Sequence, residues 1–193
     1  MATDNPSAFA LVRAQRGKVL AVFISPRSTP SREAFDRALA RVIEKSGARL
    51  VVLAGFMRIL SPWFVRRFRG RILNIHPALL PAFGGAGMHG LRVHAAVIAS
   101  GARVSGATVH FVDEQFDHGP IIAQWPVPVW PNDSPADLAA RVMDVEHLLY
   151  PRVVHALAAG RIRLDADGKV HGWNANPVAP HFSYGTDLDD VRR

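Results

Sequence analysis

Residues 71–81 read Arg-Ile-Leu-Asn-Ile-His-Pro-Ala-Leu-Leu-Pro and combine a short apolar run with two polar side chains. The run 71–75 predicts a buried strand, because it is apolar and is soon followed by the turn residue Pro77. Asn74 and His76 stand at the end of this strand, two residues apart, so an extended backbone points both side chains to the same side. Ligands of α/β sheets bind beyond the carboxyl ends of the strands, which makes this pair a candidate functional site.

Apolar runs and amphipathic segments alternate on both sides of this stretch. They predict buried strands over 18–24 and 49–54, further strands over 103–112 and 120–130, and helices over 7–16, 32–46, 91–100 and 135–158, with a short helix opened by Ser61-Pro62 and a small hairpin over 161–172. This alternation indicates an α/β protein with a mainly parallel sheet. We place a single domain at residues 1–175 and a loose tail at 176–193.

The composition fits an ordinary globular domain and excludes several classes of protein. Hydrophobic residues make up 49% and charged residues 20% of the 193 residues. The chain has no cysteine, which excludes disulfides, zinc–thiolate sites and a cysteine nucleophile. No signal segment or apolar run of about 18 residues is visible, so we expect a soluble, cytoplasmic protein without a membrane partner.

The basic charge does not by itself indicate a nucleic-acid partner. The formal net charge is +7, and such a charge attracts nucleic acids, membranes or small anions. However, the arginines are spread over several predicted helices, with one dense cluster at 66–71. We therefore expect a solvated basic surface and not a nucleic-acid site.

A third polar residue, Asp117, follows the predicted strand 103–112. An amide, an imidazole and a carboxylate are the groups that acyl transfer to an amine requires. Asn74 could donate a hydrogen bond to a tetrahedral oxyanion, and His76 could protonate the leaving nitrogen. A neighbouring carboxylate favours the charged form of the histidine. The structural alternative is that Asn-x-His-Pro is an ordinary turn and that Asp117 belongs to an ordinary loop.

The segment between these groups is rich in glycine. Residues 83–90 read Phe-Gly-Gly-Ala-Gly-Met-His-Gly and lead into the predicted helix 91–100. Glycine tolerates backbone conformations that other residues avoid. The composition therefore favours a loop that moves or lies close to a ligand.

Several further stretches carry a family resemblance. They are 51–62 (Val-Val-Leu-Ala-Gly-Phe-Met-Arg-Ile-Leu-Ser-Pro), 73–81, 108–113 with 117–122, and the motifs between Arg141 and Pro151. Together they resemble the folate-dependent formyltransferases, most specifically the phosphoribosylglycinamide formyltransferases of purine synthesis, over roughly residues 7–165. The resemblance implies a Rossmann-like, three-layer formyltransferase fold. It also implies formyl transfer from 10-formyltetrahydrofolate to the amine of glycinamide ribonucleotide, without a metal ion.

The resemblance also assigns roles to individual residues. His76 would be the proton donor, Asn74 would polarise the formyl oxygen, and Asp117 would keep His76 protonated and help to relay a proton. His110 would lie near the reacting centre, or it is a buried strand histidine. The folate would be bound by Arg32, Met57, Arg58, Ile59, Leu60, Asn74, Asp113, Glu114, Gln115, Phe116 and Asp117. The ribonucleotide would be bound by Met143, Asp144, Val145 and Glu146.

The family's first strand and phosphate-binding glycine loop have no counterpart in this sequence. We therefore expect an N-terminally truncated version of the fold with a weakened ribonucleotide site, since such a loop binds phosphate at a helix N-terminus. The alternatives are a 10-formyltetrahydrofolate hydrolase, a methionyl-tRNA formyltransferase, a non-catalytic folate-binding remnant and a metal site built from some of the nine histidines. The sequence leaves a homodimer open.

Overall fold

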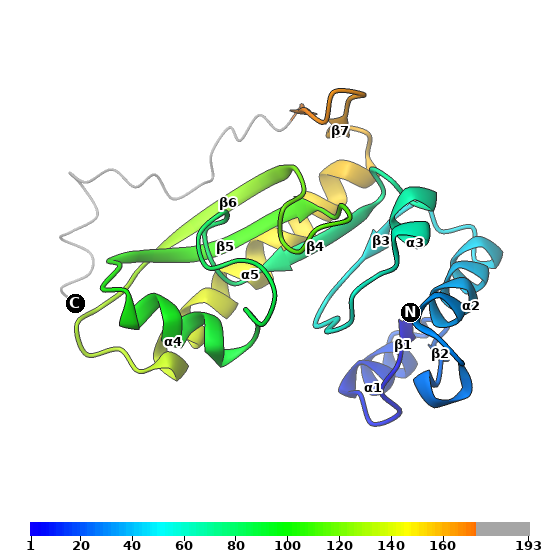
Figure 1. Cartoon of the computed structure of the whole chain (residues 1–193), viewed down its shortest axis with the longest axis horizontal. Helices are drawn as coiled ribbons and strands as arrows, with labels where there is room; N and C mark the ends of the chain where they lie inside the picture. The colour runs from blue at the N-terminus through cyan, green and yellow to red at the C-terminus, as the bar shows by residue number, and fades with distance from the viewer. Residues whose placement is uncertain (173–193) are drawn as a thin grey trace. The chain divides into compact units, whose positions relative to one another are not determined.

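The computed structural model describes residues 1–172 (Figure 1). Its contacts divide the chain into two compact units, of which the first is Met1–Ile72 and the second begins at Leu73. The single domain over 1–175 stays a prediction, and the tail predicted at 176–193 lies outside the described residues. Within residues 1–172, no helix combines the length and the apolar character needed to cross a membrane.

The N-terminal unit consists of helices and very short strands. In chain order it contains β1 (Ala2–Thr3), α1 (Phe9–Arg16), β2 (Val22–Phe23), a 3-10 turn at Pro26–Ser28, α2 (Arg32–Lys45), β3 (Val51–Val52) and α3 (Pro62–Arg67). β1 and β2 pair in parallel. The predicted start of α3 is confirmed: the Ser61 hydroxyl accepts a hydrogen bond from the Phe64 N–H, and Pro62 is the first helical residue.

The prediction of a buried strand over 18–24 is wrong in its burial. Only Val22 and Phe23 form a strand, and Leu20 and Phe23 are 77% and 44% exposed. β1 is the only described strand that pairs with β2, so the second edge of β2 has no neighbour in the described sheet. An apolar run indicates a strand, but burial also needs a covering layer, and in the described part of the chain Leu20 and Phe23 are left largely uncovered.

The second unit contains the main core. It is built from β4 (Ile72–His76), α4 (Leu91–Ala99), β5 (Val104–Phe111), β6 (Ile121–Pro128), α5 (Pro135–Ala158) and the hairpin β7 (Arg163–Leu164) with β8 (Val170–His171). α5 packs against β5, β6 and α4 (Figure 1). Residues from these elements form one buried apolar cluster that includes Leu73, Val109, Phe111, Leu138 and Val153. Such a cluster supplies the rigid support on which a site can be held.

The predicted α/β class is confirmed, but the strands of the second unit do not run in parallel. Both described pairs, β4 with β5 and β5 with β6, are antiparallel. The loop 112–120 joins β5 to β6 and contains no helix, whereas a parallel connection needs a crossover of a dozen or more residues. An apolar run of sequence predicts a buried strand but does not specify its direction.

One interaction caps the start of α5, and another ties the helix to β4. The side chain of Ser134 accepts a hydrogen bond from the Asp137 N–H, and the Asp137 carboxylate accepts one from the Ser134 N–H, which is a capping box at the helix start. Further along the helix, the Tyr150 hydroxyl donates a 3.0 Å hydrogen bond to the Leu73 carbonyl. This second bond ties α5 to the beginning of the strand segment that carries Asn74 and His76.

Candidate active site

Neighbouring strands bring Asn74, His76 and His110 together. In the antiparallel pair of β4 and β5, Asn74 stands opposite His110, and His76, the last residue of β4, stands opposite Thr108. Side chains on opposed positions of such a pair share one face of the sheet. The prediction that Asn74 and His76 point to the same side is therefore in agreement with the register.

Asp117 comes from the loop after β5 and lies between the histidines. Its Oδ2 atom is 3.4 Å from His76 Nδ1, and its Oδ1 atom is 3.8 Å from His110 Nε2. The side chains of both histidines are almost completely buried, and that of Asp117 is 13% exposed. The structure thus brings Asn74, His76 and Asp117, which are up to 43 residues apart in the chain, into one polar cluster.

His110 belongs to the same cluster and orients Asn74. Its Nδ1 atom lies 2.8 Å from the Phe111 carbonyl, which only accepts, so Nδ1 carries the hydrogen. Neutral His110 therefore has a bare Nε2 atom, 3.3 Å from the Asn74 side-chain nitrogen. The amide of Asn74 donates one of its hydrogens there and keeps its second hydrogen for another partner. The sequence left two interpretations of His110, a buried strand histidine or a residue near the reacting centre. In the structure, His110 is buried and also lies beside Asp117.

Thr108 and Gln124 anchor the chain after His76, and neither was predicted from the sequence. The Thr108 hydroxyl donates to the Ala78 carbonyl at 2.7 Å and accepts from the Leu80 N–H at 3.0 Å. The Gln124 amide donates to the Leu80 carbonyl at 2.8 Å. Thr108 could be selected as a buried hydroxyl opposite His76 on the neighbouring strand, but only once the strand register is known.

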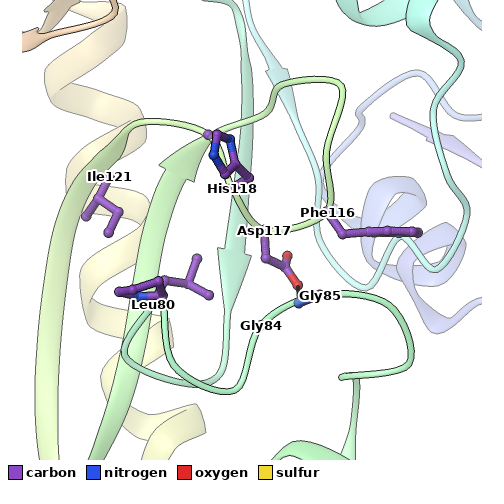
Figure 2. Close-up of a pocket in the computed structure, with 9 residues that line it drawn as sticks. Leu80, Gly84, Gly85, Phe116, Asp117, His118 and Ile121 are labelled. Atoms are coloured by element: carbon purple, nitrogen blue, oxygen red, sulfur yellow. Dashed lines mark hydrogen bonds between the residues drawn. The ribbon is translucent and has the colours of Figure 1, made fainter.

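A cavity of about 230 Å³ opens beside Asp117 (Figure 2). Its walls are mostly apolar side chains and backbone, and its titratable side chains are those of Asp117 and His118. The lining residues are Leu80, Pro81, Gly84, Gly85, Phe116, Asp117, His118, Gly119 and Ile121. Small-molecule sites are typically apolar with a few polar groups that orient the ligand. Of the polar cluster, Asp117 lines this cavity.

The other predicted binding residues lie on both units. Arg32, Met57, Arg58, Ile59 and Leu60 belong to the N-terminal unit, where Met57 is exposed, Leu60 is buried, and the Arg58 guanidinium lies over the Phe35 ring. Asp113, Glu114, Gln115 and Phe116 form the loop next to Asp117, and Met143, Asp144, Val145 and Glu146 lie on α5. Burial raises the pKa of the Glu146 carboxyl. Their roles in binding stay predictions.

Among residues 1–172, no group of three or more His, Asp or Glu side chains is arranged to hold a metal ion. Asp117 and the two histidines beside it are instead engaged with one another and with backbone groups.

Burial makes the folded protein sensitive to acid. The pKa of His110 lies below its usual value of 6.5, mainly because burial disfavours the charged imidazole, although the Phe111 carbonyl and Asp117 oppose this. The unfolded chain therefore binds a proton near pH 6.5 that the folded chain does not yet bind. Stability contributed by neutral His110 is present above the unfolded pKa and decreases as the pH falls below it.

We expect the free energy of unfolding to fall between pH 7 and pH 5, with His110 contributing at most about 1.4 kcal/mol per pH unit. Denaturant titrations at several pH values measure this slope. The His110→Gln variant should lose stability at pH 7 but show a shallower dependence on pH. An unchanged slope in that variant would contradict the role of His110.

Comparison with known proteins agrees with this architecture. The profile of the family described as formyl transferase matches residues 1–154. The chain belongs to the formyl transferase family. The predicted formyltransferase fold is thereby confirmed, including the elements that carry Asn74, His76 and Asp117.

Relatives of this formyl transferase are found in plants and bacteria. The chain is 48% identical over 147 residues to a chloroplastic phosphoribosylglycinamide formyltransferase of Arabidopsis thaliana, which covers 76% of this chain and 50% of the relative. It is 39% identical over 185 residues to phosphoribosylglycinamide formyltransferase of Escherichia coli, covering 96% and 84% of the two chains. The chain thus spans half the length of the Arabidopsis relative.

A solved structure shows the same fold. The crystal structure of glycinamide ribonucleotide transformylase 1 from Symbiobacterium toebii is 41% identical in sequence and superimposes with a TM-score of 0.81. The match covers 88% of this chain and 77% of the other. This formyl transferase therefore shares both its sequence motifs and its arrangement of elements with that protein.

Proposed function

We propose that this formyl transferase moves a formyl group from 10-formyltetrahydrofolate to the amine of glycinamide ribonucleotide. The observation that carries the proposal is the buried cluster of Asn74, His76 and Asp117 beside a cavity. The names of the relatives support the choice of donor and acceptor. The reaction forms a bond between the amine nitrogen and the formyl carbon, and breaks the bond between that carbon and the folate nitrogen.

Each side chain of the cluster has a task in this reaction. Asn74 donates its remaining N–H to the formyl oxygen, where negative charge develops as the amine attacks. His76, when protonated, supplies the proton that the departing folate nitrogen takes up. Asp117 accepts the proton that the attacking amine loses, directly or through water, and can return a proton to His76. One proton enters and one leaves the cluster, so the site returns to its starting state.

The binding of the two substrates is a further part of the proposal. The folate would contact Arg32, residues 57–60 and residues 113–117, and the ribonucleotide would contact residues 143–146. The cavity beside Asp117 supports this assignment, because its apolar walls and single carboxylate suit a planar heterocycle. The cytoplasmic location and the homodimer stay predictions.

Release of tetrahydrofolate from 10-formyltetrahydrofolate tests the proposal directly. We expect turnover that requires glycinamide ribonucleotide and yields formylated ribonucleotide in equal amount. The His76→Gln variant serves as the negative control. Turnover without the ribonucleotide, with formate as the product, would instead identify a hydrolase. Folate binding without turnover, in a folded chain, would identify a non-catalytic remnant.

A further inference from the structure

Two backbone groups of the glycine-rich loop contact the His76–Asp117 pair, one on each partner. The Phe83 carbonyl lies 2.9 Å from His76 Nε2. The Gly85 N–H donates a 2.9 Å hydrogen bond to Asp117 Oδ2, the same oxygen that faces His76 Nδ1 (Figure 2). The loop therefore holds the imidazole from one side and the carboxylate from the other.

The contact with Phe83 determines which ring nitrogen carries the hydrogen. A carbonyl oxygen can only accept, so the hydrogen bond to Phe83 requires a hydrogen on Nε2 of His76. Neutral His76 then has a bare Nδ1, and this atom is 3.4 Å from the Asp117 carboxylate. The proton that His76 gains and loses is consequently the one on Nδ1. His110 and His94 are the other titratable groups around this pair, and burial lowers the pKa of each.

Phe83 of the loop and Asp117 both adopt an uncommon backbone conformation where they make these contacts. Phe83 has a φ of 55° and Asp117 a φ of 49°, in the left-handed region, where a bulky side chain such as that of Phe83 is rare. Such conformations persist where the surrounding structure imposes them, and they are concentrated at functional sites.

Gly84 allows the loop to approach Asp117 closely. A Cβ atom at position 84 would lie 2.6 Å from Leu80 Cδ2 and 3.2 Å from Asp117 Cβ. Any other residue there would press on the carboxylate that pairs with His76. Position 87 of the same loop differs, because a Cβ atom there would meet no atom within 4 Å.

We propose that Phe83, Gly84 and Gly85 form a positioning segment that fixes neutral His76 in its Nε2–H form and makes Nδ1, facing Asp117, the site of proton exchange. These residues act through His76 and Asp117 and do not take part in the reaction themselves. The catalytic importance of this segment rests on the proposed function. The protonation form of the ring is a property of the unliganded chain and can be measured without turnover.

Nitrogen-15 NMR of the imidazole rings tests the proposal in the wild-type chain. The signals of His76 are assigned by their loss in the His76→Gln variant and followed over a pH series. We expect neutral His76 to carry its hydrogen on Nε2 and to have a bare Nδ1 that faces Asp117. Neutral His76 with a bare Nε2 would overturn the proposal, whether or not the chain transfers formyl groups.

The variants Gly84→Ala and Gly87→Ala test the loop itself. Gly84→Ala should give a mixture of the two ring forms and reduce kcat by about 10²-fold, with a smaller change in KM, because the reacting groups are displaced. Gly87→Ala strains the backbone at a φ of 83° but should keep the wild-type ring form. An unchanged His76 spectrum in folded Gly84→Ala would refute the role of the loop, and absence of turnover in the wild type would refute only the proposed function.

Discussion

The His76→Gln variant should lose about 10²–10⁴-fold in kcat, the usual contribution of a general acid–base group. The glutamine amide still offers an N–H to the Phe83 carbonyl, which His76 Nε2 contacts at 2.9 Å. It has no group that titrates near neutral pH and so cannot supply a proton to the departing folate nitrogen. The substitution therefore separates proton transfer from the packing role of the side chain.

Steady-state kinetics with both substrates measures this loss, and near-UV circular dichroism checks that the variant is folded. His89→Gln is a suitable control, because His89 is an exposed histidine of the glycine-rich loop without a proposed role. That variant should keep the wild-type kcat. Wild-type activity in His76→Gln would remove His76 from the mechanism, even though its position in the cluster would stand.

Several elements and the three polar residues of the cluster could be predicted from the sequence. The helical pattern over 135–158 predicts α5 at its observed bounds. Asn74 and His76 were identified because an extended backbone places residues two apart on one side. Asp117 was found as a carboxylate in the loop that follows a buried strand.

Other features depend on the three-dimensional arrangement. The contacts of Phe83 and Gly85 with the pair use backbone atoms, which every residue has, so side-chain identity does not reveal them. The orientation of Asn74 by His110 follows from the register of β4 with β5, and their antiparallel direction is not encoded in apolar runs. Leu20 is apolar but exposed, because its hydrophobicity does not determine whether other residues cover it in the fold.

Gly119 connects the fold to the position of Asp117. The N–H of Phe111, the last residue of β5, donates a 2.9 Å hydrogen bond to the Pro120 carbonyl, so the chain returns along β5 directly after its loop. A Cβ atom at position 119 would overlap the Phe111 carbonyl oxygen and lie 3.2 Å from the Asp113 N atom. These are backbone atoms and cannot rotate away, so either the end of β5 or the loop with Asp117 must move.

The Gly119→Ala variant should therefore lose both stability and activity. Forcing an extra methyl group into a packed region typically costs about 1–3 kcal/mol, and a displacement of about 1 Å at the reacting groups can reduce kcat by about 10²-fold. Gly101→Ala is the matched control, because its φ of 74° brings backbone strain without any atom within 4 Å of the new Cβ. Denaturant unfolding and kcat should separate the two variants: Gly101→Ala loses stability alone, whereas Gly119→Ala loses stability and turnover together. Wild-type kcat in Gly119→Ala would mean that the loop tolerates the shift and that the close return of the chain along β5 does not position Asp117.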